Sequence, residues 1–122
     1  MREKIFITRA TLVDKSKLEF QVESEKTLKD FIASGKMLVD SDGISFIYLL
    51  EKSEEYTYVV IDEKYWKQLN EALSEEALVF ITNGKEQIEL VNIFDELSYL
   101  VENIKGNSNY GNEMVAKVEA VF

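Results

Sequence analysis

Hydrophobic and polar residues alternate through the N-terminal part of the chain. Ile5 and Ile7 begin the alternation, and it resumes over residues 18–22 after a polar interval at 14–16. An alternation of period two is typical of strands with one buried face. The pattern therefore predicts two strands joined by a short turn.

The spacing changes to that of a helix over residues 25–34. Leu28, Phe31 and Ile32 follow i, i+3, i+4 spacing, and Gly35 comes directly after the segment. Because glycine commonly follows the last turn of a helix, we predict a short helix over 25–34.

A hairpin is predicted in the middle of the chain. Residues 44–50 are apolar at six of seven positions, which is typical of a central strand buried on both faces. The turn residues 40–43 precede this strand, and residues 56–61 are rich in β-branched and aromatic side chains. A tight turn between the two strands would place Tyr48 opposite Tyr58.

A helix and a second hairpin are predicted next. Asp62 is placed to cap the helix, because a carboxylate accepts from the free amides of a first turn. Its apolar stripe consists of Tyr65, Trp66, Leu69 and Leu73. Residues 77–81 form an apolar strand, and Asn83-Gly84, the pair favoured in type I′ turns, returns the chain over 87–90.

Two further helices are predicted in the C-terminal part. The first runs over 93–105 with Asn92 as its N-cap, and Gly106 follows its end. The last segment is capped by Asn112 and fits a helical face. Its even positions from 114 to 122 are also all apolar, so a strand remains the alternative.

These elements predict an α+β fold. About seven strands, mostly joined by hairpins, and three or four helices fit a single domain over residues 1–122 with a mainly antiparallel sheet. No linker, repeat or low-complexity tract divides the chain.

The net charge limits the classes of partner that we expect, and the sequence also indicates a cellular location. There are 23 acidic and 14 basic residues, a net charge of −9. This balance argues against nucleic-acid binding and against binding to anionic membranes, because both need a basic face. Charges interrupt the apolar residues at the N-terminus, and no stretch approaches about 18 apolar residues. With no cysteine for disulfides, we expect a cytoplasmic protein.

The absence of histidine and cysteine limits the chemistry. Neither residue type occurs in the chain, so histidine-based triads, cysteine nucleophiles and thiolate zinc sites are excluded. We therefore predict no catalytic residue, no metal ligand and no cofactor, and we favour a protein that is not an enzyme.

The 40–43 turn is one candidate binding site. Asp40 and Asp42 precede Gly43, as in the middle of a calcium-binding loop. Aligning the glycine with that loop puts Leu38 and Leu49 at ligand positions, so the pattern favours a hairpin turn. The adjacent carboxylates elsewhere in the chain fit solvated faces and helix starts.

The stronger candidate is the polar loop over 106–112. It carries no charge, and its amide and hydroxyl groups supply both donors and acceptors beside an aromatic ring. The candidate binding residues are Asn107, Asn109, Tyr110 and Asn112. The alternative is purely structural: a helix end followed by a helix start, with Asn107 or Asn109 in a left-handed conformation.

The strings Met37-Leu38-Val39-Asp40-Ser41-Asp42 and Asn103 to Asn112 carry a resemblance that runs nearly end to end, with Phe46, Tyr48 and the helix around Trp66. The chain resembles the YjbL-like proteins, an uncharacterised family of small acidic proteins from low-GC Gram-positive bacteria. The resemblance implies a bacterial cytoplasmic protein, and it transfers no activity, cofactor or residue role.

Three functional hypotheses follow. The first is a non-enzymatic interaction or regulatory module that presents the 106–112 loop to a protein with a basic surface. The second is a carboxylate- or metal-dependent enzyme that uses Asp40, Asp42 and a distant glutamate. The third is a homodimer joined through a sheet edge or through the apolar stripe of residues 118–122.

Overall fold

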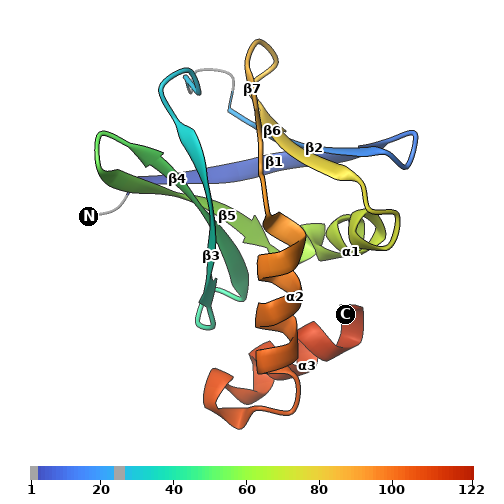
Figure 1. The fold of residues 1–122 in the computed structure, drawn as a ribbon. Coiled ribbons are helices and arrows are strands. Elements are labelled where there is room, and N and C mark those ends of the chain that lie inside the picture. Colours follow the sequence, from blue (N-terminus) through green and yellow to red (C-terminus); the bar gives the residue numbers. More distant parts are fainter. Residues whose placement is uncertain (1–2, 24–26) are drawn as a thin grey trace.

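A curled, seven-stranded sheet with helices on its concave side makes up the fold (Figure 1). The structure is a computed structural model that describes residues 3–23 and 27–122. The described strands are β1 (Glu3–Val13), β2 (Lys17–Val22), β3 (Ile32–Asp40), β4 (Ser45–Lys52), β5 (Glu55–Asp62), β6 (Leu78–Thr82) and β7 (Gln87–Glu89). The helices are α1 (Trp66–Ser74), α2 (Ile93–Ile104) and α3 (Asn112–Val121), with 3-10 turns η1 (Glu63–Tyr65) and η2 (Ser108–Tyr110). The predicted α+β class is confirmed.

The strand order is β3-β4-β5-β1-β2-β6-β7. Most neighbours are antiparallel, as predicted, but β1 pairs with β5 in parallel and β2 pairs with β6 in parallel. The η1 and α1 segment connects β5 to β6, which lie on opposite sides of the central β1–β2 hairpin. The chain passes through β2, β3 and β4 between β1 and β5, and through β3 to α1 between β2 and β6. Parallel neighbours need such long connections, so a prediction based on hairpins does not reveal them.

The helix predicted over 25–34 is wrong where the structure describes it. Residues 24–26 lie outside the described part, and β3 begins at Ile32. Leu28 is buried whereas Ile32 is 69% exposed, so these residues do not share one helical face. Gly35 has a φ of +76° inside β3, where the pairing with β4 shifts register. This glycine therefore marks an irregularity in a strand, not the end of a helix.

The central hairpin is confirmed, but its register differs by one residue from the prediction. Tyr48 pairs with Val59, and Leu49 pairs with Tyr58. Because successive side chains point to opposite faces, Tyr48 enters the main core while Tyr58 lies on the other face of the sheet.

A two-residue turn with positive φ at both positions occurs in the β4–β5 hairpin, and not in the β6–β7 hairpin where the sequence predicts it. Ser53 and Glu54 both have positive φ in the two-residue turn between β4 and β5. At Asn83-Gly84 only the glycine does, so the type I′ turn predicted there is wrong. The β6–β7 loop has four residues because the Asn83 side chain accepts hydrogen bonds from two later backbone amides.

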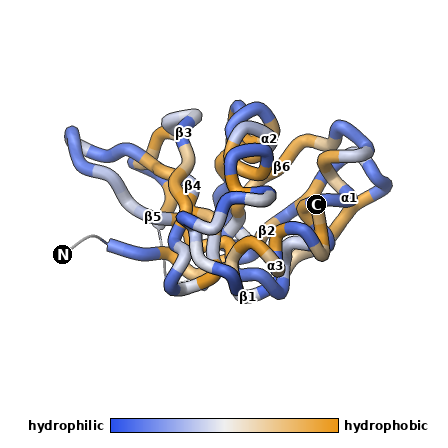
Figure 2. The backbone as a smooth tube through the Cα atoms, turned by 90° about the horizontal axis from the view of Figure 1, so that it is seen from below, coloured by the Kyte–Doolittle hydropathy of each residue, from blue (hydrophilic) through white to orange (hydrophobic). Residues whose placement is uncertain are grey.

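The main core lies between the sheet and the three helices, where the hydrophobic segments gather (Figure 2). Trp66 is fully buried, its ring centroid 4.9 Å from that of Phe46 and 5.9 Å from that of Phe122. The last segment is a helix, as favoured above, with Met114 and Val118 buried. The 118–122 stripe thus packs on the protein's own core, and we assign no dimer contact to it.

The predicted helix caps are partly corrected. Asp62 does cap the start of the η1–α1 segment, accepting from the Lys64 amide at 3.3 Å. Asn92 stands at the start of α2 but has a φ of +63°, and its side chain makes no cap hydrogen bond. Asn112 is the first residue of α3, whose cap position is Gly111. Within the described ranges, no helix has the length and apolarity that a membrane span requires.

Candidate functional site

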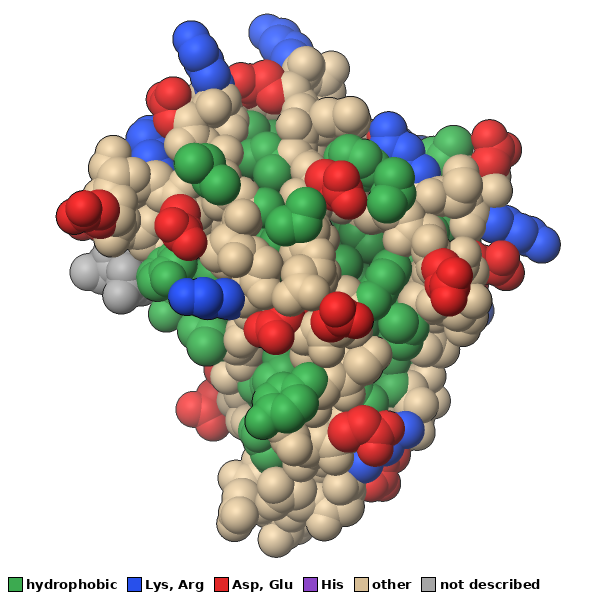
Figure 3. Space-filling model, viewed as in Figure 1, with side chains coloured by type: hydrophobic (Ala, Val, Ile, Leu, Met, Phe, Trp, Pro, Cys, Tyr) green, Lys and Arg blue, Asp and Glu red, His purple; other side chains and the backbone are tan. Residues whose placement is uncertain are grey.

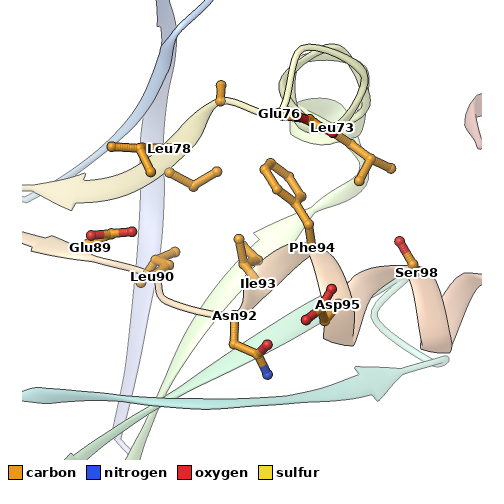
Figure 4. Close-up of a pocket in the computed structure, with 12 residues that line it drawn as sticks. Leu73, Glu76, Leu78, Glu89, Leu90, Asn92, Ile93, Phe94, Asp95 and Ser98 are labelled. Atoms are coloured by element: carbon orange, nitrogen blue, oxygen red, sulfur yellow. The ribbon is translucent and has the colours of Figure 1, made fainter.

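A cleft of about 440 Å³ opens between the end of α1, strands β6 and β7, and the first turn of α2 (Figure 4). We call it the acidic cleft. Its floor consists of Leu73, Leu78, Val79, Leu90, Ile93 and Phe94. Its rim carries the carboxylates of Glu76, Glu89 and Asp95.

The floor is built by chain segments that the sheet fixes in place. The Leu90 amide donates to the Val79 carbonyl oxygen at 2.8 Å, and both side chains are buried. Leu78 alternates with Val79 on β6, so it points the other way and is 52% exposed. Phe94 projects from α2 toward the end of α1 (Figure 4). The floor thus rests on buried, hydrogen-bonded strand segments and is apolar where it meets solvent.

The rim has charge of one sign. All three carboxylate side chains belong to exposed residues, and none of the residues that line the cleft is a lysine or an arginine. On the face of the molecule seen in Figure 3, acidic side chains lie beside apolar ones, and lysines or arginines stand mostly toward its margins. Within the described ranges, no three acidic side chains lie close enough together to hold one metal ion. The carboxylates therefore surround an apolar surface and do not form a compact ligand set.

Tyr48 anchors the wall behind the cleft. Its hydroxyl donates to the Val91 carbonyl oxygen at 2.6 Å and accepts from the Gly35 amide at 3.1 Å. Burial is the main cause that raises the pKa of Tyr48 to about 12, and the charges of Glu89 and Glu96 raise it further. The neutral phenol is therefore maintained, and it is the form that can donate to a carbonyl.

Asn92, which precedes α2, and Glu96 in its first turn complete this wall. Asn92 donates to the Gly35 carbonyl oxygen at 3.1 Å, and Glu96 accepts from the Met37 amide at 3.2 Å. Through these bonds, side chains at the start of α2 satisfy backbone groups on the outer edge of β3, where a further strand would otherwise pair. They also explain why Asn92 does not cap its own helix: its amide is turned toward β3.

Glu86 holds the segment before β3 against the β6–β7 loop. Its Oε1 accepts from the Leu28 amide at 2.9 Å and from the Asn83 side chain at 3.0 Å. These hydrogen bonds, the Leu28 amide foremost, lower the pKa of Glu86 below its ordinary value. The two edge strands of the sheet are thereby linked through their flanking loops.

The predicted residues of the 40–43 turn lie outside the acidic cleft. Asp40 accepts from the Gly43 amide at 3.0 Å, and a Cβ atom at Gly43 would come within 2.6 Å of the same carboxylate. A side chain at position 43 would therefore displace the Asp40 carboxylate. Asp42 is exposed on the turn. The turn explains this motif without a bound ion.

The 106–112 loop is organised mainly by its own hydrogen bonds. Asn107 donates to the Asn103 carbonyl oxygen and accepts from the Asn109 amide, both at 3.1 Å. Neither Asn107 nor Asn109 has a positive φ, so the predicted left-handed asparagine is wrong. Tyr110 is half-buried against the core. The side chains of Asn109 and Asn112 remain exposed.

The loop borders a separate depression of about 370 Å³, lined by Gly106, Ser108, Asn112, Val115, Ala116 and Glu119. Both this loop and the 40–43 turn lie toward the lower end of the molecule in Figure 1, away from the acidic cleft. The structure therefore does not unite the predicted residues with the acidic cleft.

Comparison with known proteins places the chain among proteins without an assigned role. A model of a family of unknown function, UPF0738, matches residues 6–122. The chain is 42% identical to UPF0738 protein YjbL of Bacillus subtilis (strain 168), over 100% of this chain and 99% of that protein. The chain belongs to the UPF0738 family.

Other members of the UPF0738 family show similar relationships. A UPF0738 protein of Bacillus pumilus (strain SAFR-032) is 38% identical over 100% of this chain and 99% of its own. One from Bacillus cereus (strain G9842) is 41% identical over 81% of this chain and 80% of its own. No solved structure matches the chain. The resemblance seen in the sequence is confirmed, and the family carries no described activity.

Sequence reasoning missed the acidic cleft because its residues are scattered between positions 73 and 98 on four elements. The most useful signal was Leu78, an apolar residue that the structure leaves exposed at the start of a strand. Its alternation with Val79 could have shown that one of the two faces solvent.

Proposed function

We propose that this UPF0738 protein is a non-enzymatic interaction module whose acidic cleft binds a basic amphipathic segment of a partner protein. The observation that supports the proposal is the pairing of an apolar floor with a rim of carboxylates and no lysine or arginine in the lining. Exposed apolar surface in a concave site is characteristic of binding sites. The proposal places this interaction in the cytoplasm.

The two parts of the cleft have different tasks in this proposal. Leu78 and Phe94 offer apolar surface to one or two anchoring side chains, which would supply most of the affinity. The three carboxylates pair with lysines or arginines beside the anchors. Exposed charges mainly steer the encounter and set orientation, so the rim selects a basic partner.

The wall behind the cleft supports the proposal because it holds α2 in one position. Tyr48, Asn92 and Glu96 fix the first turn of this helix against β3 before any partner arrives. A surface that is already ordered loses less conformational entropy on binding.

We keep the 106–112 loop as a second contact surface of the same module. Asn109 and Asn112 are the exposed side chains that remain available there. The 40–43 turn, with Asp40 and Asp42, is a third surface for a basic partner. A carboxylate- or metal-dependent enzyme remains the alternative function.

The test uses two labelled helical peptides, one of leucine and arginine and one of leucine and glutamate. We expect the wild-type chain to bind the basic peptide and not the acidic one, measured by fluorescence anisotropy. The double variant Glu89→Lys/Asp95→Lys should lose this binding. The matched control Glu71→Lys/Glu102→Lys, with the same change of charge at exposed positions outside the cleft, should keep it.

Equal binding of both peptides, or equal loss in both double variants, would contradict the proposal. Thermal shift with Mg²⁺, Mn²⁺ and Ca²⁺ tests the alternative, since a specific ligand stabilises the native state. A shift with one ion that disappears in the Asp40→Asn/Asp42→Asn variant would favour the metal-dependent enzyme.

A further inference from the structure

A second apolar surface lies on the convex side of the sheet, formed by β3, β4, β5 and β1. Ile47, Leu49 and Val60 form a cluster there, and Tyr56 and Tyr58 pack against it. All five belong to strands, and within the described ranges no helix residue joins the cluster. We call this surface the outer sheet face.

An apolar row crosses the outer sheet face from one strand to the next. The pairing aligns Leu38 with Ile47, Ile47 with Val60, and Val60 with Phe6. The two ends of the row are open to solvent, since Phe6 is 59% exposed and Leu38 is 42% exposed. A continuous exposed apolar row of this kind is a candidate interaction surface.

The charges on the two sides of the row differ in sign. On one side, Lys4 pairs with Tyr58, and the Lys36 Nζ lies 3.5 Å from the Tyr56 hydroxyl. On the other side, the pairing of Ser45 with both Asp40 and Asp62 places the two carboxylates in line. Glu51, which pairs with Tyr56, lies beyond the lysines. The outer sheet face therefore has a basic side, an apolar centre and an acidic side.

Such a surface is complementary to itself. A two-fold axis along the apolar row superposes the rows of two copies and exchanges their sides. Lys36 of each copy then faces Asp40 of the other, because both lie on β3 on either side of Leu38. Lys4 faces Thr8 of the other copy and lies one strand away from its Asp62. An isologous dimer requires this kind of self-complementary patch, and sheets that pack face to face lie about 10 Å apart.

We propose that two copies of this chain associate through their outer sheet faces. Four strands about 4.8 Å apart and five residues about 3.4 Å apart cover roughly 19 by 17 Å, which is small for a stable interface. The dimer should therefore dissociate on dilution. This proposal does not depend on the acidic cleft, which lies elsewhere on the molecule.

Phe6 provides the first test. We expect sedimentation velocity to show a concentration-dependent dimer for the full chain. Phe6→Glu should weaken it by at least about tenfold, because it places a charge in the apolar row. Tyr99→Glu, at a residue 67% exposed on α2, is the matched control and should leave the dimer unchanged. Circular dichroism checks that each variant folds.

The charged sides provide a decisive second test. Lys36→Asp and Asp40→Lys should each abolish the dimer, because each opposes like charges across the axis. An equimolar mixture of the two variants should form a heterodimer, because every opposed pair is again of opposite sign. A wild-type chain that stays monomeric at about millimolar concentration would overturn the proposal. So would a mixture that stays monomeric while the wild type dimerises.

Discussion

The acidic cleft and the outer sheet face are both apolar surfaces bordered by charge, but their borders differ. The cleft has carboxylates and no lysine or arginine among its lining residues. The outer sheet face has lysines on one side of its apolar row and aspartates on the other. A border of one sign suits a partner of the opposite sign, whereas a border of both signs suits a second copy. The arrangement of charge thus separates two modes of association that hydrophobicity alone would not distinguish.

Of the variants that distinguish the two surfaces, Tyr48→Phe is expected to have the largest effect. It should perturb the acidic cleft and leave the outer sheet face unchanged. It leaves the Val91 carbonyl and the Gly35 amide without their partner in a part-buried wall. We expect a loss of about 2–3 kcal/mol in the free energy of unfolding, because each orphaned group costs free energy. Denaturant unfolding measures the loss. Peptide binding should weaken while dimerisation by folded protein is unchanged, and the opposite result would contradict the separation.

The second effect comes from reversing the rim charges. Glu89→Lys/Asp95→Lys should weaken binding of the leucine–arginine peptide by about 30-fold, roughly 2 kcal/mol, since two attractions become repulsions at exposed sites. Titration by fluorescence anisotropy gives the change. Sedimentation should show the same dimer as the wild type. A weakened dimer would mean that the two surfaces are not independent.

A rise in pH should loosen the wall of the cleft. Because the pKa of Tyr48 is raised to about 12 in the folded state, the stabilisation is complete below the unfolded pKa near 10 and is lost as pH rises toward 12. At pH 11 the loss should be about 1 kcal/mol. The difference in unfolding free energy between wild type and Tyr48→Phe should shrink over this range, and a constant difference would contradict the assignment.

The smallest effect distinguishes two asparagines of the 106–112 loop. Asn107→Ala should lower the free energy of unfolding by about 1 kcal/mol, because it removes bonds to Asn103 and Asn109. Asn109→Ala should change it by less than about 0.5 kcal/mol, as is usual for an exposed position. Thermal denaturation compares them. If the loop is a contact surface, Asn109→Ala is the variant that should reduce capture of a partner.

Local patterns predicted much of the fold. The alternation of Leu18, Phe20 and Val22 and the stripe of Ile93, Leu97 and Val101 depend on one element each. The parallel pairs β1–β5 and β2–β6 join residues more than 50 positions apart, so no local pattern contains them. Leu28 and Ile32 show a second limit of local patterns. Their spacing is that of a helix, yet Ile32 begins a strand and Leu28 precedes it.

The candidate site was less predictable than the fold for the same reason. Asn107 and Asn92 both looked like local turn or cap residues, yet Asn107 bonds to Asn103, four positions away, while Asn92 bonds to Gly35, 57 positions away. The charge border of the outer sheet face depends on the register of four strands. A one-residue error, like the one at Tyr48 and Tyr58, would have moved these side chains to the other face.

The contact of Glu96 and Asn92 with β3 also bears on aggregation. A border strand with open amides and carbonyls is a template on which further chains add. Here the Met37 amide is already bound by Glu96 of α2, and the Gly35 carbonyl by Asn92 just before this helix. The deuterium exchange rate of the Met37 amide should therefore report how often this helix lifts away. We expect conditions that speed that exchange to be those in which the edge of β3 becomes open to pairing with a further strand.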